Sequence, residues 1–166
     1  MTEPTGATRL YPIMGDPIKY VESPTRLTRT LHDRRHDGIC IPMHVPADGL
    51  AAVMAGLAAT PNVDGILVTM PHKFTAFEYC ATSSQRAKLL NVVSIIRRNT
   101  DGSWHGDMLD GHAFVKAQID QGAQPDGARA LLLGAGGQVA QSPSPSSKPA
   151  STSSPSTIPT RHASTP

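Results

Sequence analysis

Short apolar runs alternate with stretches of helical spacing through the first 127 residues of the chain. The run GILVT at 65–69 is continuously apolar, which indicates a strand covered on both faces within a parallel sheet. Ser23 and Pro24 offer an N-cap and a first-turn proline for a helix. The predicted strands cover 10–14, 38–44 and 65–69, and the predicted helices between them cover 23–36 and 46–59. This order predicts two β-α-β crossovers.

The pattern continues with shorter elements. Residues 92–98 alternate in polarity and join 103–106 through a turn of the sequence NTDG, which predicts a hairpin. Asp110 suits the N-cap of a following helix. Helices are predicted over 71–79, 83–90 and 110–121, and one more buried strand over 128–133. The predicted fold class is therefore α/β, with an open, mainly parallel sheet flanked by helices.

Composition changes abruptly at Gln138. Of the 29 residues from there to the end, nine are Ser, six are Pro and four are Thr. Such a segment buries too little apolar surface to offset the entropy of ordering, so we expect it to be disordered. The predicted organisation is an α/β domain over 1–127, a short apolar segment over 128–137 and a Ser/Pro/Thr-rich tail over 138–166. We interpret the break as a reading-frame shift or a premature truncation.

Charge adds little to this picture. Lys and Arg number 15 and Asp and Glu 13, so the net charge is +2, which favours neither nucleic acid nor an anionic membrane as a partner. The sequence shows no membrane-span run and no leader pattern, so we predict a cytoplasmic location. Cys40 and Cys80 lie in apolar surroundings and are interpreted as buried, reduced thiols. Nothing in the sequence indicates an oligomeric state.

Candidate chemistry begins where the apolar strand at 65–69 ends. Ligands of open α/β sheets gather beyond the carboxyl ends of the strands, and Thr69 and Lys73 fall there. A partly buried lysine at such a place can exchange a proton with an alcohol or carbonyl oxygen, although a solvated lysine is the ordinary alternative. The Asp110 carboxylate could hold that ammonium, or could simply cap its helix.

Two other sets of residues carry weaker signals. His72 and His112 could line a pocket or lie on the surface, and no set of residues has the spacing of a metal site, so no metal is predicted. Gly134, Gly136 and Gly137 follow an apolar strand, as at the start of a dinucleotide-binding turn. The amphipathic helix and the later acidic residue that complete such a motif do not follow. Taken alone, these glycines are therefore only a weak signal of a dinucleotide-binding turn.

Four short motifs, followed by an apolar segment, together indicate one family. They are GDPI at 15–18, Ser23-Pro24, VTMPHK at 68–73 and the spacing G-x-x-x-D-G at 106–111, followed by LLLGAGG. In this order they resemble the substrate-binding domain of shikimate dehydrogenases. The resemblance covers residues 10–137 and implies a substrate domain joined to an NADP-binding Rossmann domain, in which NADPH reduces 3-dehydroshikimate to shikimate.

The resemblance also implies roles for individual residues. The catalytic Lys-Asp pair of the family falls on Lys73 and Asp110. Lys73 would pass the proton to the substrate oxygen, and Asp110 would orient Lys73. Ser23 and Thr69 match positions that hydrogen-bond the substrate, and Ser94 stands where the family has an asparagine. The cofactor implied is NADP, with Gly134, Gly136 and Gly137 as what remains of its site. By the same resemblance, residues 128–137 would be the first strand and turn of a truncated, incomplete Rossmann domain.

Other positions depart from the family pattern. Val21 stands in place of a serine, Leu67 in place of an asparagine, and Met108 and Leu109 in place of Asn-Thr. A buried substrate hydroxyl left without a partner costs about 1–3 kcal/mol, so these changes point to a less hydroxylated substrate or a different one.

Two functions follow as expectations. The first is an NADP-dependent, shikimate dehydrogenase-like oxidoreductase acting on a small cyclic hydroxy acid, with this chain as its substrate-binding part and inactive alone. The second is a non-catalytic module that binds a small molecule. An interaction protein that works through the Ser/Pro-rich tail has only composition in its favour.

Overall fold

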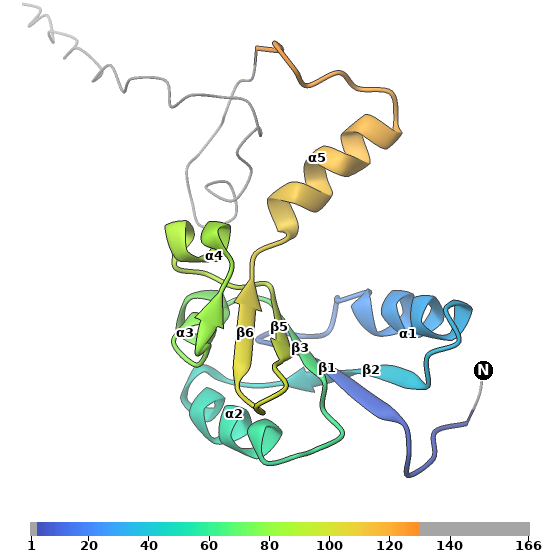
Figure 1. Ribbon diagram of the computed structural model, residues 1–166, viewed down its shortest axis with the longest axis vertical. Helices are drawn as coiled ribbons and strands as arrows, with labels where there is room; N and C mark the ends of the chain where they lie inside the picture. The colour runs from blue at the N-terminus through green and yellow to red at the C-terminus, as the bar shows by residue number, and fades with distance from the viewer. Residues whose placement is uncertain (1–2, 130–166) are drawn as a thin grey trace, which may run out of the picture.

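A six-stranded sheet forms the centre of the molecule (Figure 1). The computed structural model describes residues 3–129. In chain order the elements are β1 (Arg9–Gly15), α1 (Ser23–Asp33), β2 (Gly38–His44), the 3-10 turn η1 (Ala47–Gly49), α2 (Leu50–Ala58), β3 (Gly65–Val68), α3 (Lys73–Phe77), β4 (Thr82–Ser83), α4 (Gln85–Leu90), β5 (Ile95–Arg98), β6 (Trp104–Asp107) and α5 (Asp110–Asp120).

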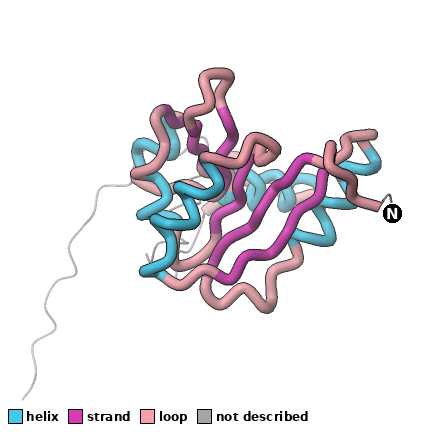
Figure 2. The backbone as a smooth tube through the Cα atoms, turned by 90° about the horizontal axis from the view of Figure 1, so that it is seen from below, coloured by secondary structure: helices cyan, strands magenta, loops and turns pink. Residues whose placement is uncertain are grey.

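The strand order is β2-β1-β3-β5-β6-β4. β1 pairs in parallel with both β2 and β3, and β4 pairs in parallel with β6, whereas β5 runs antiparallel to both of its neighbours. Figure 2 shows the two long strands, β1 and β2, side by side. The predicted α/β class, the crossovers and the hairpin are confirmed. β5 and β6 are antiparallel because a tight turn joins them.

The hydrophobic core lies between one face of the sheet and the helices α2, α3 and α4. Its members are fully or almost fully buried: Met14, Val45, Leu50, Met54, Val63, Ile66, Val68, Ala76, Ala87, Val92, Val93, Ile96, Trp104 and Met108. On the other face α1 packs against β2 without burying any of its residues completely. α5 extends away from the sheet, and only Gly111 in its first turn is buried (Figure 1).

Both predicted N-caps are wrong. The N-cap of α1 is Glu22 and that of α5 is Leu109, each without a side-chain cap, while Ser23 and Asp110 are the first helical residues. The turn before Ser23 takes helical backbone angles one residue early, and the Asp110 carboxylate is engaged elsewhere. The hydroxyl that does cap a helix is that of Ser84, which accepts a hydrogen bond from the Ala87 amide (3.2 Å) at the start of α4.

The two cysteines differ in burial. Cys40 is buried and Cys80 is half-buried, so the expectation of two buried thiols holds only for the first. Burial raises the pKa of both thiols to about 11, which keeps them protonated and unreactive at neutral pH. Neither forms a disulfide. Within residues 3–129 no helix is long and apolar enough to cross a membrane.

Most of the predicted strand at 128–133 and the whole tail at 138–166 lie outside the described residues, as do Gly134, Gly136 and Gly137.

Candidate active site

The carboxyl ends of β1 and β3 lie next to each other and form the edge on which the candidate site is built. The Thr69 amide donates to the Met14 carbonyl (3.0 Å), and the Asp16 amide donates to the Met70 carbonyl (2.9 Å). A Cβ atom on Gly15 would collide with the Thr69 methyl group and would come within 2.8 Å of the Met70 carbonyl oxygen. Glycine at 15 therefore lets the segment that carries Thr69 lie directly against the end of β1.

Lys73 enters the site from the first residue of α3. The turn before it is closed by a hydrogen bond from the His72 amide to the Thr69 carbonyl (3.0 Å), and the Lys73 carbonyl accepts from the Val93 amide (3.0 Å). The Lys73 side chain is only 11% exposed, and its Nζ donates to Oδ2 of Asp110, whose side chain is 44% exposed. A buried ammonium requires such a partner, because leaving it unpaired in a medium of low polarity is costly.

Asp110 reaches Lys73 because Ser94 ties together the segments that carry the two residues. The Ser94 carbonyl accepts from the Val68 amide (2.9 Å), and its amide donates to the Asp107 carbonyl (2.9 Å). Its Oγ accepts a hydrogen bond from the Leu109 amide (3.0 Å), one residue before Asp110. The Ser94 hydroxyl proton stays available to an acceptor on a ligand.

Two hydroxyl groups predicted to contact substrate are uncommitted. Within residues 3–129 neither the Thr69 hydroxyl nor the Ser23 hydroxyl makes a side-chain hydrogen bond, and both residues are half-buried. The structure thus brings Thr69, Lys73, Ser94 and Asp110 together through direct bonds and shared turns. Ser23 lies at the first residue of α1, and no hydrogen bond or ion pair among the described residues joins it to that group.

His72 has a structural role. It is 2% exposed, and its Nε2 lies 2.6 Å from the Val45 carbonyl oxygen, so the ring donates a hydrogen bond to the backbone after β2. That bond anchors the turn from which Lys73 projects. His112, by contrast, is exposed on α5. In the part of the chain that the structure describes, no three His, Cys, Asp or Glu side chains are grouped to hold a metal ion.

Sequence reasoning missed Asp107, whose hydrogen bonds fix the segment that leads from β6 to Asp110. Its carboxylate accepts hydrogen bonds from Arg86 (2.7 and 2.6 Å), from the Ser84 hydroxyl (2.5 Å) and from the Met108 amide (2.7 Å). These bonds, that of Arg86 first, lower the pKa of Asp107 to about 2 against the opposing effect of burial. The spacing of two aspartates in the sequence GDMLDG was the available signal, but it does not reveal which of them faces a guanidinium.

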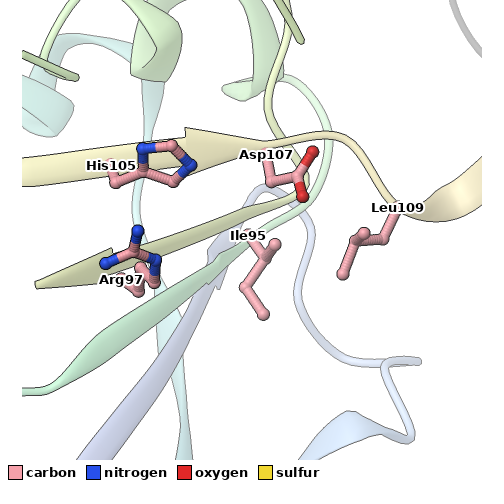
Figure 3. Close-up of a pocket in the computed structure, with 5 residues that line it drawn as sticks. All are labelled: Ile95, Arg97, His105, Asp107 and Leu109. Carbon is pink, nitrogen blue, oxygen red and sulfur yellow. The ribbon is translucent and has the colours of Figure 1, made fainter. Parts of the chain in front are cut away.

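A pocket of about 210 Å³ adjoins the site on the outer face of the β5–β6 hairpin (Figure 3). It is lined by Ile95, Arg97, His105, Asp107 and Leu109. Its two apolar residues follow or precede site residues directly, since Ile95 comes after Ser94 and Leu109 comes before Asp110. The arrangement as a whole combines a proton donor held by a carboxylate, the two hydroxyl-bearing side chains of Thr69 and Ser94, and an apolar surface.

The sequence matches the family profile described as "Shikimate dehydrogenase substrate binding domain" over residues 13–96. It is 35% identical over 134 residues to the shikimate dehydrogenase (NADP(+)) of Geobacter metallireducens, which covers 80% of this chain and 46% of that protein. The corresponding protein of Geobacter sulfurreducens is 36% identical over 135 residues, with 80% and 46% covered. This chain spans about half the length of the curated relatives it matches.

Solved structures agree with this picture. Shikimate 5-dehydrogenase from Listeria monocytogenes, crystallised in complex with shikimate and NAD, superposes with a TM-score of 0.69 at 28% identity, over 75% of this chain and 43% of that one. A 5-ketofructose reductase of a Gluconobacter strain shares the fold, with a TM-score of 0.73 at 24% identity over 81% of this chain and 48% of that one.

Proposed function

This chain belongs to the shikimate dehydrogenase family, and on that premise we propose that it forms the substrate-binding side of an NADP-dependent oxidoreductase for a small cyclic hydroxy acid. The observation that carries the proposal is the Lys73–Asp110 ion pair, in which a side chain only 11% exposed reaches a half-exposed carboxylate at the edge of the sheet. The uncommitted Thr69 hydroxyl and the hydroxyl proton of Ser94 lie in the segments that form this edge.

In the proposed reaction Lys73 handles the proton. On reduction its ammonium protonates the substrate oxygen as that oxygen gains negative charge, and on oxidation the neutral amine takes the alcohol proton back. Asp110 accepts a hydrogen bond from Nζ, which holds the amine in place. Thr69 and Ser23 donate hydrogen bonds to the hydroxyl or carboxylate oxygens of the substrate.

Bound NADP supplies or accepts the hydride. The residues predicted to hold its pyrophosphate, Gly134, Gly136 and Gly137, lie outside the described residues. The proposal for the described chain is therefore limited to substrate binding and proton transfer. A cytoplasmic location also stays a prediction.

Binding of a cyclic acid to the 166-residue chain is the direct test. In a 15N-labelled sample we expect shikimate or a related cyclic acid to shift the amide signals of Thr69, Lys73, Ser94 and Asp110, and K73M to lose at least tenfold in affinity. K88M is the matched control, because Lys88 is an exposed lysine on α4. Equal affinities for K73M and the unchanged chain would refute the proposal.

The alternative is a binding module without catalysis. Turnover measured through NADPH absorbance separates the two. Binding that depends on Lys73, together with no NADP-dependent turnover for any of several cyclic hydroxy acids, would favour the module.

A further inference from the structure

Three apolar side chains form a corner beside the Lys73–Asp110 pair, and we call Leu67, Ile95 and Leu109 the apolar corner. Leu67 on β3 stands directly opposite Ile95 on β5, so their side chains lie on the same face of the sheet. Ile95 in turn stands opposite Asp107, and Leu109 lies two residues beyond Asp107. Figure 3 shows Ile95 and Leu109 on one side of the hairpin, where both line the pocket.

The apolar corner faces the same side as the hydroxyl-bearing Thr69. Thr69 follows Leu67 by two residues, directly after the end of β3, and packs over Gly15. Gly15 in turn follows Ile13, the partner of Leu67 on β1, by two residues. Leu109 is bonded through its amide to Ser94 Oγ and precedes Asp110. A ligand that touches both Thr69 and the Lys73–Asp110 pair therefore has the apolar corner along one flank.

The polar side chains that line the pocket already have partners among the described residues, and Arg97, two residues farther along β5 than Ile95, donates to Asn99 (3.1 Å). The Asp107 carboxylate is occupied by Arg86, Ser84 and the Met108 amide. His105 is bonded through Nδ1 to Thr82 (2.8 Å), two residues farther along β6 from the site. Met108, at 2% exposed, is a core residue and offers nothing to a ligand.

We infer that the ligand of this site presents a hydrocarbon flank to Leu67, Ile95 and Leu109, so that the chain selects a cyclic acid with fewer hydroxyl groups than shikimate. The inference rests on the proposed function and names its substrate class. A ring hydroxyl turned toward the apolar corner would lose its hydrogen bonds to water without replacement. A CH₂ group in its place would bury apolar surface instead.

The affinities of two ligands with different numbers of hydroxyl groups test this selectivity. The probes are shikimate and a monohydroxycyclohexene carboxylate, titrated separately into the 166-residue chain. The monohydroxy acid lacks two of the three ring hydroxyls of shikimate. We expect it to bind at least about tenfold more tightly, which is the order expected when one of those two hydroxyls would be buried unpaired against the apolar corner. L67N and, independently, L109N should reduce or reverse that preference by giving the hydroxyl a partner.

L89N is the matched control, because Leu89 is 76% exposed on α4, and it should leave the preference unchanged. Tighter binding of shikimate than of the monohydroxy acid by the unchanged chain would overturn the inference while leaving the proposed function standing. Binding of neither acid would instead refute the proposed function, and the inference with it. The first comparison needs no variant, so it does not depend on how L67N or L109N folds.

Discussion

The Lys73 ammonium and the Asp110 carboxylate form an ion pair across 37 residues of sequence, with the lysine side chain buried and the aspartate half-exposed. This asymmetry of burial makes the two partners unequal for stability. Removing the carboxylate leaves a charge buried without a partner, whereas removing the ammonium leaves a carboxylate that water can still reach.

We therefore expect D110N to lower the free energy of unfolding by about 1–2 kcal/mol and K73M to change it by less than about 0.5 kcal/mol or to raise it. Both variants should lose ligand binding. Urea denaturation measures the first effect and ligand titration the second. Equal destabilisation by K73M and D110N would contradict the burial described for this pair.

Two glycine-to-alanine substitutions should have opposite effects. G15A places a methyl group against the Thr69 side chain and the Met70 carbonyl, so we expect a loss of about 1–3 kcal/mol and weaker ligand binding. Gly56 lies inside α2 with open space around its Cα, so G56A should add about 0.5–1 kcal/mol. Thermal unfolding of the pair checks both signs, and a stabilised G15A would show that Thr69 is not packed on Gly15.

Arg98 is expected to be the most sensitive charged residue outside the site. Its guanidinium donates to the carbonyls of Val63 (2.8 Å), Leu57 (2.9 Å), Thr60 (3.1 Å), Ala58 (3.1 Å) and Gly102 (3.3 Å), and lies 4.3 Å from the centre of the Trp104 ring. We expect R98A to cost about 3 kcal/mol, because several carbonyls lose their donor at once.

R98K should recover little of that loss, since one ammonium cannot reproduce the planar fork of a guanidinium. The neighbouring R97A is the control: Arg97 is exposed, and within residues 3–129 its guanidinium donates only to Asn99 (3.1 Å). Denaturant unfolding should separate the two arginines clearly, and similar losses for both would contradict the arrangement.

Acid should remove the contribution of Asp107. Its pKa is lowered to about 2 in the folded protein, chiefly by Arg86, and lies near 3.9 when the chain is unfolded. The ionised form thus stabilises the fold fully above about pH 5, and the contribution is lost as the pH falls from about 4 toward 2. Because Arg86 is half-exposed, we expect only about 1 kcal/mol from the pair.

The difference in unfolding free energy between the unchanged chain and D107N should therefore shrink over that pH range. D120N is a suitable control, because Asp120 pairs with Lys116 on the exposed surface of α5. A difference that stays constant down to pH 2 would exclude the Asp107 carboxylate as its source.

Periodicity predicted the fold well because the central strands and α2 bury apolar residues at the spacing of their own element. The range 38–44 was predicted from alternation alone and is β2, and GILVT supplies β3. Hydrogen bonds between residues far apart in the chain were harder to predict. Alternation places Arg98 on one face of β5, but only the packing of α2 beneath that face shows that five carbonyls converge there.

The site was predicted unevenly for the same reason. The order of the motifs singled out Lys73, Asp110 and Thr69 as site residues, and the structure places them together. Their roles stay predictions. Local rules then misplaced Asp110, because an N-cap assignment considers only the next helical turn, whereas the carboxylate binds an ammonium from α3. His72 resembled an ordinary surface histidine because nothing nearby in the sequence identifies the Val45 carbonyl as its acceptor.

The exposure of α5 has a mechanical consequence. Among the described residues, this 11-residue helix meets the sheet only through its first turn, and its Phe114 and Ile119 are 57% and 51% exposed. A helix of that length has little stability without packing. Since Asp110 is the first residue of α5, a partner that bound the far end of this helix and changed its direction would also move the carboxylate that accepts from Lys73 Nζ.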